Sequence, residues 1–366
     1  MEKMKKVVIS KQDLKNNLKI IDSLKKQECK IIGVVKANGM GLDLVQYSKF
    51  LTENGVSTLA VSEPEEAFEL REKKINSEIL LLTPINDAKI LEKLIKNEIT
   101  VTLSTLGQAQ DLIKISKKIK KNINVHIKID TGFSRYGFIY TENKKILEIF
   151  KMKEYLNIKG IYTHFSNAIN PKDTKLQFER FQKIINNIKS EGYNTGILHC
   201  CNSTAFIKYP SMHLDAVRLG SIIQGRTLVK VGGLKRIGKF ITSISEIKQL
   251  PKGYNIGYGN TYKTNKETKI AIIPVGHNDG FEVTNKRDNF KFIENVKSVA
   301  IEIRKIFKKE NAQVIIRNKK CNVIGRIGLN YSVIDITDKE SIKLTDEVIV
   351  SENLLKINNQ IRREYI

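Results

Sequence analysis

Short apolar stretches alternate with amphipathic stretches along the first two-thirds of the chain. Eight of the apolar stretches are rich in β-branched residues and are bounded by turn formers, which is typical of buried strands. They cover residues 31–38, 58–64, 78–84, 99–105, 124–130, 158–165, 195–203 and 216–223. Apolar residues at helical spacing predict a helix within 12–29, before the first strand, and helices between the strands such as 65–74, 86–97, 106–121, 142–156 and 173–191. Eight alternating strand and helix units predict a (β/α)8 barrel of the TIM type.

The pattern changes after about residue 235, where strand-like stretches predominate and turn-rich stretches such as PKGYNIGYGN separate them. One convincing helix is predicted there, over 294–308. The short apolar run KVVIS within residues 1–10 precedes the first barrel helix and is expected to pair with this second part. We therefore expect a barrel domain over 11–235, and a mainly β domain over 236–366 together with 1–10.

Composition and charge narrow the class of protein. The 366 residues, 41% of them hydrophobic, suit a folded protein with a large core. The basic start MEKMKK is followed by no apolar core of a signal peptide, and no apolar stretch is long enough for a membrane helix, so we expect a cytoplasmic protein without a membrane partner. The net charge of +24 comes from lysines dispersed along the chain, with no basic block interleaved with aromatic residues, and we expect no nucleic-acid partner.

The four cysteines show neither CxxC spacing nor a companion histidine pattern. We interpret them as reduced, structural residues, and we expect no metal site.

Polar residues fall at or just past the carboxyl ends of five predicted strands: Lys36, Asp130, His164, Ser203 and Arg218. Barrel enzymes build their active sites on this face, although barrel rims are polar for structural reasons as well. Lys36 is the most unusual of the five, because it ends an otherwise apolar strand. The cost of burying such a lysine is usually compensated in one of two ways: by an ion pair with a carboxylate, or by covalent attachment to a carbonyl cofactor. Burial favours the second, because it lowers the pKa of the amine.

Seven segments carry a resemblance to a known family, and they occur in the family's order over nearly the full length. They are VVKANGMG, KIDTGFSRYGF, THFSNA, CNSTA, VRLGSIIQG, IGYGNTY and IPVGHNDGF. The chain resembles the bacterial alanine racemases, which are fold type III enzymes that use pyridoxal 5′-phosphate. The resemblance implies this cofactor, an amino-acid substrate and a homodimer with shared active sites.

The resemblance also implies roles for individual residues. Lys36 would carry the cofactor as a Schiff base, and Tyr258, supplied by the partner subunit, would be the second catalytic base. Arg135 and the backbone amide of Leu329 would hold the substrate. The remaining residues implied to contact the cofactor are His164, Asn202, Ser203, Arg218, Gly220 and Ser221.

These roles agree with the chemistry of racemisation. A racemase removes the α proton from one face of a planar intermediate and returns a proton to the other, so it needs an acid or base group on each face. Lys36 and Tyr258 would supply them. Arg218 would donate a hydrogen bond to the pyridine nitrogen from an always-charged guanidinium, and His164 would adjust Arg218 and Tyr258. Lys128 occupies a position that is carbamylated in some relatives.

Several positions depart from the family pattern. Met40 replaces a tyrosine near the phosphate, and His277 replaces a tyrosine at the site entrance. Leu329 replaces a methionine, and the usual tyrosine near the carboxyl terminus falls at Asn359 or Gln360. Because lost hydroxyls weaken phosphate binding and widen the pocket, we expect alanine to remain a substrate while serine or a larger amino acid competes.

Other classes remain as alternatives. A decarboxylase of the same fold type shares the barrel and the lysine, but it is normally longer and carries a cysteine motif that the surroundings of Cys321 do not match. The barrel-only proteins of pyridoxal phosphate homeostasis lack a second domain. A non-enzymatic binding module would need neither Lys36 nor Tyr258.

Overall fold

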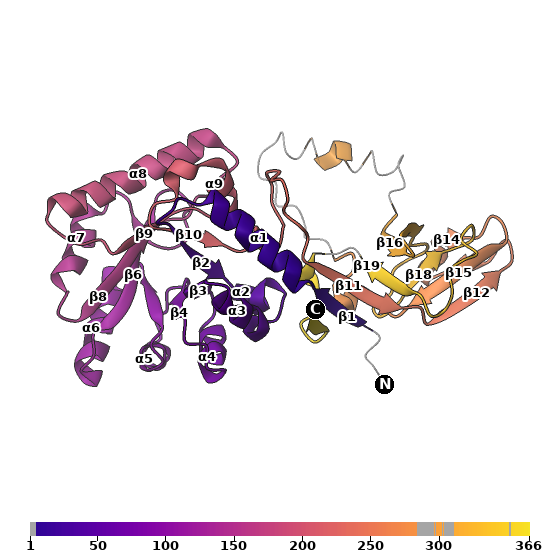
Figure 1. Cartoon of the computed structure of the whole chain (residues 1–366), viewed down its shortest axis with the longest axis horizontal. Coiled ribbons are helices and arrows are strands. Elements are labelled where there is room, and N and C mark those ends of the chain that lie inside the picture. Colours follow the sequence, from indigo (N-terminus) through magenta and orange to yellow (C-terminus); the bar gives the residue numbers. More distant parts are fainter. Residues whose placement is uncertain (1–4, 284–295, 297, 302, 304–310, 351–352) are drawn as a thin grey trace. The chain divides into compact units, whose positions relative to one another are not determined.

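A computed structural model describes residues 5–283, 296, 298–301, 303, 311–350 and 353–366. The chain forms two compact units, which are Lys11–Ile237 and Met1–Ser10 together with Gly238–Ile366 (Figure 1). No helix within the described ranges is both long and apolar enough to cross a membrane.

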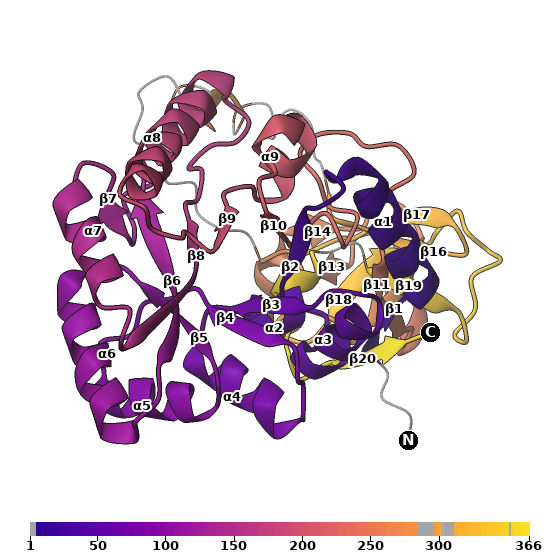
Figure 2. The ribbon, with the colours of Figure 1, turned by 60° about the vertical axis from the view of Figure 1, so that its left-hand side comes forward.

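The Lys11–Ile237 unit is a closed barrel of eight parallel strands, which confirms the predicted fold class (Figure 2). The strands pair in the order β5-β4-β3-β2-β10-β9-β8-β6, and pairing between β5 and β6 closes the barrel. Their bounds are β2 (Lys30–Val34), β3 (Thr58–Val61), β4 (Glu78–Leu81), β5 (Thr100–Leu103), β6 (Ile123–Asp130), β8 (Leu156–Tyr162), β9 (Ile197–His199) and β10 (Ala216–Leu219). A short strand, β7 (Phe138–Ile139), adds to β6.

Helices α4 to α8 lie on the outside of the strands (Figure 2). Several begin at residues whose side chains accept backbone N–H groups of the first turn, as Asp43, Asp87, Thr105 and Asn170 do. The helical elements of this unit are α1 (Lys11–Leu24), α2 (Lys36–Met40), α3 (Leu44–Glu53), α4 (Pro64–Glu72), α5 (Ala88–Lys96), α6 (Leu106–Ile119), α7 (Asn143–Lys151), α8 (Pro171–Ser190), α9 (Ser203–Lys208) and η1 (Pro210–Met212).

The barrel strands are short and buried on both faces, because helices cover one face and the barrel interior the other. Every residue of β3, β5 and β10 is buried. The strands are therefore nearly continuous in apolar residues, which is why their positions could be predicted from the sequence. Their polar residues concentrate where the strands end, at the face that carries the cavity described below.

The second unit is mainly β. It holds a six-stranded sheet ordered β17-β16-β19-β11-β1-β20, a three-stranded sheet β12-β15-β18 and the pair β13-β14. In the larger sheet, β1 pairs antiparallel with β11 and parallel with β20. The bounds are β1 (Lys5–Ile9), β11 (Gly238–Ser243), β12 (Glu246–Leu250), β13 (Asn255–Ile256), β14 (Tyr262–Lys263), β15 (Thr268–Ile273), β16 (Gln313–Ile316), β17 (Lys319–Asn322), β18 (Ser332–Asp335), β19 (Glu347–Val350) and β20 (Arg362–Tyr365).

Among the described residues of this unit there are three single turns of 3-10 helix: η2 (Tyr258–Asn260), η3 (His277–Asp279) and η4 (Leu354–Lys356). Most of the helix predicted over 294–308 lies outside the described residues. Those that are described within it, 296, 298–301 and 303, are helical.

Candidate active site

A cavity of about 330 Å³ lies at the carboxyl ends of the barrel strands. Every barrel strand except β5 contributes a lining residue from its end or from the loop that follows it. Four lining residues are basic, namely Lys36, Lys128, Arg135 and Arg218, and none is an aspartate or a glutamate. A small pocket with this balance of charge favours an anionic ligand.

Lys36 does not end the strand, as its sequence context predicted, but begins the turn that follows. Strand β2 ends at Val34, and Lys36 is the first residue of α2, whose next four residues adopt left-handed backbone conformations. Ala37, Asn38 and Met40 pay about 1–2 kcal/mol each for positive φ. Asn38 helps to hold the turn, because its side-chain oxygen accepts the N–H of Leu44 at 3.0 Å. Lys36 thereby lies at the cavity, half-buried, where the chain leaves the barrel wall.

The Arg218 guanidinium is buried and held from behind by five acceptors. One terminal nitrogen donates to His199 Nδ1 at 2.7 Å and to the His199 carbonyl at 3.2 Å. The other donates to the carbonyls of Thr163 and Cys200 at 2.7 and 3.3 Å and to His164 Nδ1 at 3.2 Å. All five acceptors are uncharged histidine nitrogens or carbonyl oxygens, and within the described part of the chain no aspartate or glutamate lines the cavity beside them. Arg218 is therefore a fixed cation at the cavity, where it favours an anionic or hydrogen-bond-accepting ligand.

A chain of hydrogen bonds continues from Arg218 into the barrel interior. Since Arg218 donates to Nδ1 of His199, the proton of His199 is on Nε2, which lies 2.9 Å from Nδ1 of His126. Tyr162 stacks on His199 at a centroid distance of 4.9 Å and lies under the guanidinium. Burial and the nearby Arg218 charge hold the pKa of His199 well below its usual range and lower that of His126 to about 3. Both rings are therefore neutral supports of the cation.

His164 lies two residues beyond β8 and lines the cavity. Burial, followed by the charges of Arg218 and its cationic neighbours, holds its pKa well below the ordinary value. Because its Nδ1 accepts from Arg218, its Nε2 carries the proton. His164 is thus a neutral hydrogen-bond donor at the cavity.

Ser203 joins the loops that follow β9 and β10. Its hydroxyl oxygen accepts the N–H groups of Gly220 and Ile222 at 3.3 and 3.4 Å, which leaves the hydroxyl proton to be donated elsewhere. The side-chain oxygen of Asn202 accepts two N–H groups of the first turn of α9. Ser221 completes this end of the cavity. Small side chains and exposed backbone at such a place suit a phosphate group.

Arg135 and Lys128 supply the other cations. The Arg135 guanidinium lies 4.3 Å from the ring centroid of Phe133, and Lys128 Nζ lies 5.5 and 5.4 Å from the rings of Tyr136 and Tyr162. Burial, with a smaller contribution from Arg135, lowers the pKa of Lys128 from 10.5 to about 7. Lys128 therefore changes its charge near neutral pH.

This pKa predicts how the Lys128→Met variant should differ in stability from wild type. Below about pH 7 the folded protein keeps a buried charge, and its replacement by methionine should raise the free energy of unfolding. Above pH 7 folded Lys128 is neutral while the unfolded chain stays protonated up to about 10.5, so wild-type stability rises by about 1.4 kcal/mol per pH unit. Urea titrations at pH 6, 7.5 and 9 measure the free energy of unfolding of both proteins, and the gain of Lys128→Met over wild type should shrink as the pH rises. The control Lys183→Met, at an exposed lysine, should show no such pH-dependent difference. An equal gain at all three pH values would contradict this prediction.

Asp130 is the exception among the five strand-end residues, because it does not line the cavity. One of its carboxylate oxygens accepts the N–H groups of Gly132, Phe133 and Ser134 at 2.8–3.1 Å. It thereby shapes the loop that carries Arg135, which is a structural role. The other four converge on the cavity, as do Arg135, Asn202, Gly220 and Ser221.

The sequence interpretation missed the residues that support Arg218 from inside the barrel. Tyr162 lies two residues before His164, and His126 lies two residues before Lys128. Alternate residues along an extended strand point to the same face, so this spacing could have indicated that Tyr162 and His126 lie on the same side of the barrel wall as the site residues. His199, as the last residue of β9, could have been indicated by its place at a strand end.

Tyr258 and Leu329 belong to the second unit and are 62% and 69% exposed. Tyr258 lies between Gly257 and Gly259, both at positive φ, and its ring centroid is 6.2 Å from that of Tyr331. Leu329 is held through its carbonyl, which accepts the N–H of Asn278 at 2.9 Å. All residues that line the cavity belong to the barrel, and the roles of Tyr258 and Leu329 stay predictions.

A closed barrel with a lysine and three other cations at the carboxyl ends of its strands defines the class: a TIM-barrel enzyme with an anionic ligand. Comparison with known proteins gives the family. Residues 9–227 match the family described as "Alanine racemase, N-terminal domain", and residues 237–363 match "Alanine racemase, C-terminal domain". This chain belongs to the alanine racemase family.

Individual relatives agree over nearly the whole chain. An alanine racemase of Methanococcus maripaludis is 34% identical over 346 residues, which are 92% of this chain and 86% of the relative. One of Clostridium perfringens is 36% identical over 357 residues, 94% and 85% of the two chains. The solved alanine racemase of Clostridium difficile 630 has a TM-score of 0.87 at 29% identity and covers 100% of this chain and 96% of its own.

Proposed function

We propose that this protein is a pyridoxal 5′-phosphate-dependent racemase that interconverts L- and D-alanine. The observation that carries the proposal is the cavity with four cations and no carboxylate, in a chain of this family. A phosphate dianion and a substrate carboxylate would together balance the charges of Lys36, Arg135 and Arg218, while Lys128, whose pKa is about 7, can lose its own charge. Residues 11–235 are proposed to hold the cofactor, and 236–366 with 1–10 to supply the second base.

The phosphate end of the cavity fits the cofactor. Ser203 has a hydroxyl proton to donate, and Asn202 fixes the adjoining turn of α9. A Cβ atom on Gly220 would lie 3.3 Å from Val34 and 3.4 Å from Met40, which is closer than most packed atoms lie. Only a glycine leaves room in this narrow part of the cavity. We assign the phosphate to Ser203, Gly220 and Ser221.

The guanidinium of Arg218 fits the pyridine nitrogen. When bound, the cofactor supplies a conjugated ring that withdraws electron density and acidifies the Cα–H bond of an amino acid. Arg218, fixed by the five acceptors, donates a hydrogen bond to the ring without giving up its proton. Neutral His164 supports this arrangement by accepting a hydrogen bond from Arg218 at its Nδ1. A donor that keeps its proton would leave the ring nitrogen unprotonated, which would favour return of the proton to Cα over side reactions.

Lys36 has two proposed tasks. Lys36 would hold the cofactor covalently through Nζ, and with a substrate bound in its place this Nζ would be a free amine. This amine accepts the Cα proton on one face, while the Tyr258 hydroxyl donates a proton on the other, and each group does the opposite in the reverse direction. Arg135 and the Leu329 amide orient the substrate carboxylate. In this assignment Tyr258 comes from the partner subunit of a homodimer.

A substrate panel tests the proposal. We expect purified protein with pyridoxal phosphate to interconvert the enantiomers of alanine faster than those of serine, lysine or arginine. Chiral chromatography of all four reactions, with carbon dioxide release measured in parallel, also tests the decarboxylase alternative. Alanine as the poorest of the four substrates would contradict the proposal.

A broader substrate range is the second candidate, and Met40 favours it. This side chain lines the cavity, where the family pattern has a tyrosine hydroxyl, and offers no hydrogen bond there. His277 is turned to its own loop, since its Nδ1 lies 3.1 Å from the carbonyl oxygen of Phe281. Serine turnover within about tenfold of alanine would support this candidate.

A further inference from the structure

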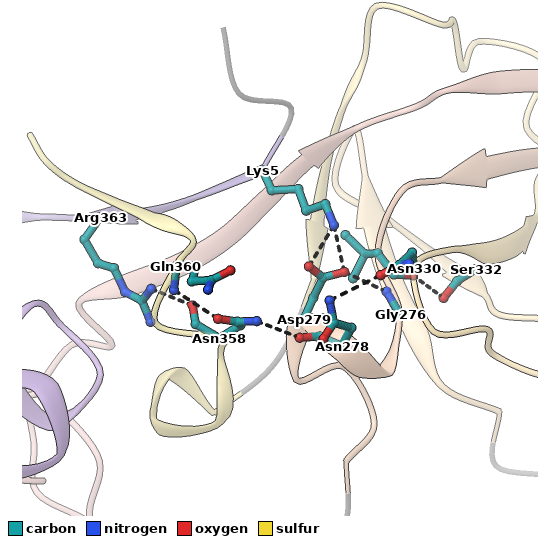
Figure 3. A network of polar contacts seen from close by, with 10 residues as sticks. Lys5, Gly276, Asn278, Asp279, Asn330, Ser332, Asn358, Gln360 and Arg363 are labelled. Carbon is teal, nitrogen blue, oxygen red and sulfur yellow. Dashed lines mark hydrogen bonds and ion pairs between the residues drawn. The ribbon is translucent and has the colours of Figure 1, made fainter.

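The second unit contains an ion pair between a partly buried lysine and a buried aspartate, which no role proposed so far uses. Lys5 Nζ of β1 donates to both carboxylate oxygens of Asp279 at 2.7 and 2.9 Å (Figure 3). Asp279 is 4% exposed and also accepts the N–H of Gly276 at 3.0 Å. The pair therefore fixes the turn η3 from inside.

Backbone hydrogen bonds join the turn η3 to the segment that carries Leu329. The N–H groups of His277 and Asn278 donate to the carbonyls of Gly328 and Leu329 at 3.1 and 2.9 Å. A Cβ atom on Gly276 would lie 2.2 Å from the Gly328 carbonyl oxygen, so the two backbones are in direct contact.

Side chains add to this attachment on both flanks of the turn (Figure 3). Asn278 Nδ2 donates to Asn330 Oδ1 at 3.3 Å, and the Ser332 hydroxyl donates to the Val275 carbonyl at 2.7 Å. On the other side, Asn358 Nδ2 donates to the Asn278 carbonyl at 3.0 Å. The turn thus links β1, the residues after 357 and the segment 325–331.

The segment 325–331 also supports the loop of Tyr258. A Cβ atom on Gly257 would lie 3.0 Å from the Arg326 nitrogen, and one on Gly325 would lie 2.6 Å from the Ile256 carbonyl oxygen. The Tyr331 ring lies beside that of Tyr258. One segment therefore carries Leu329 and contacts the loop of the proposed second base.

We propose that the Lys5–Asp279 ion pair is a positioning device for segment 325–331 and so for the groups that hold and protonate the substrate. The inference rests on the proposed function of Leu329 and Tyr258. Without Lys5, Asp279 would be a buried charge lacking its cation, which the turn relieves by moving toward water. The carbonyl contacts at Gly328 and Leu329 would then shift with it.

The neighbouring lysine provides a matched control. Lys6 lies on the same strand and pairs with Glu364 at 3.3 Å, with both side chains about 30% exposed, so its partner is a carboxylate outside η3. We expect Lys5→Met to raise the KM for alanine by about tenfold with kcat changed less than about threefold, and Lys6→Met to leave both within about twofold. Lys5→Arg, which keeps a cation on Asp279, should restore the KM.

Asp279→Asn is the second variant, because it keeps an oxygen for the Gly276 N–H but loses the charge. It should show the same rise in KM, and it decides the case if Lys5→Met does not fold. Equal KM values for Lys5→Met and Lys6→Met, or a rise that Lys5→Arg leaves in place, would overturn the inference. A wild-type protein that does not racemise alanine would contradict the proposed function instead.

Discussion

The Lys36→Ala variant is expected to lose at least about a thousandfold in the interconversion of L- and D-alanine, in both directions. Under the proposed function two losses would combine in this variant: covalent attachment of the cofactor and the amine proposed to accept the Cα proton on one face. The cavity and the Arg218 support should persist, because Lys36 is half-buried and follows β2 rather than forming part of it.

Two measurements check this prediction. Borohydride reduction of the wild-type holoenzyme followed by peptide mapping should find the cofactor on Lys36, and the variant should carry none. Chiral chromatography gives the activity. Lys30→Ala is the control, since Lys30 is an exposed lysine on the same strand and should keep both properties. A cofactor that remains bound covalently to the Lys36→Ala variant, or activity above about a tenth of wild type, would refute the role of Lys36.

The large loss of activity is expected because the other cations of the cavity are each held in their own position and cannot replace Lys36. Arg218 is fixed from below by His199 and the carbonyls, and Arg135 stands on a loop that Asp130 shapes. Lys128 is buried deeply enough for its pKa to fall to about 7. None of these side chains can take the place of Lys36, because a guanidinium does not release its proton and Lys128 is confined by burial.

The barrel was predictable from the sequence because its strands are buried on both faces and its helices on one. A strand such as Thr58–Val61 is buried at every residue and is apolar at all but its first position, and α5 shows its apolar face at helical spacing. The polar ends of the strands were predictable for the same reason. A charged or polar residue after such a strand has few places to lie other than the barrel mouth.

Two features of the site were not predictable in this way. The left-handed turn of 37–40 violates the ordinary preference of Ala37 and Met40, and it depends on contacts such as Asn38 with Leu44 that only the folded chain makes. The role of Asp130 depended on which way its carboxylate turns. Its carboxylate accepts three backbone N–H groups from residues at most four positions away, and these local hydrogen bonds turn it away from the cavity.

The histidines that support Arg218 from the barrel interior were also not predicted. His126 and His199 are separated by 73 residues, and their contact at 2.9 Å results from two barrel strands that do not neighbour each other in sequence. A lone histidine in an apolar strand is usually a satisfied core residue, and single-position reasoning stops there. The pairing gives these neutral rings a function: they hold the Arg218 cation without adding charge to the barrel interior.

The Tyr258→Phe variant is expected to lose between about a hundredfold and ten-thousandfold of racemase activity while retaining the cofactor on Lys36. Phenylalanine keeps the ring, and so its contact with Tyr331, but removes the hydroxyl that is proposed to exchange a proton with Cα. With one proposed base left, an amino acid would lose and regain its proton on the Lys36 face only. In the two-base proposal, racemisation requires both residues, whereas proton exchange requires one.

This distinction gives the measurement. In deuterated water the variant should still exchange the α proton of one alanine enantiomer, seen by NMR, without forming the other, whereas wild type exchanges and interconverts both. Tyr254→Phe is the control, because Tyr254 is an exposed tyrosine, 54% accessible, in the same turn-rich stretch and should behave as wild type. Full racemisation by Tyr258→Phe would assign the second base to another group. Loss of exchange for both enantiomers would mean that Tyr258 acts on the Lys36 face as well, and the two-base assignment would then be wrong.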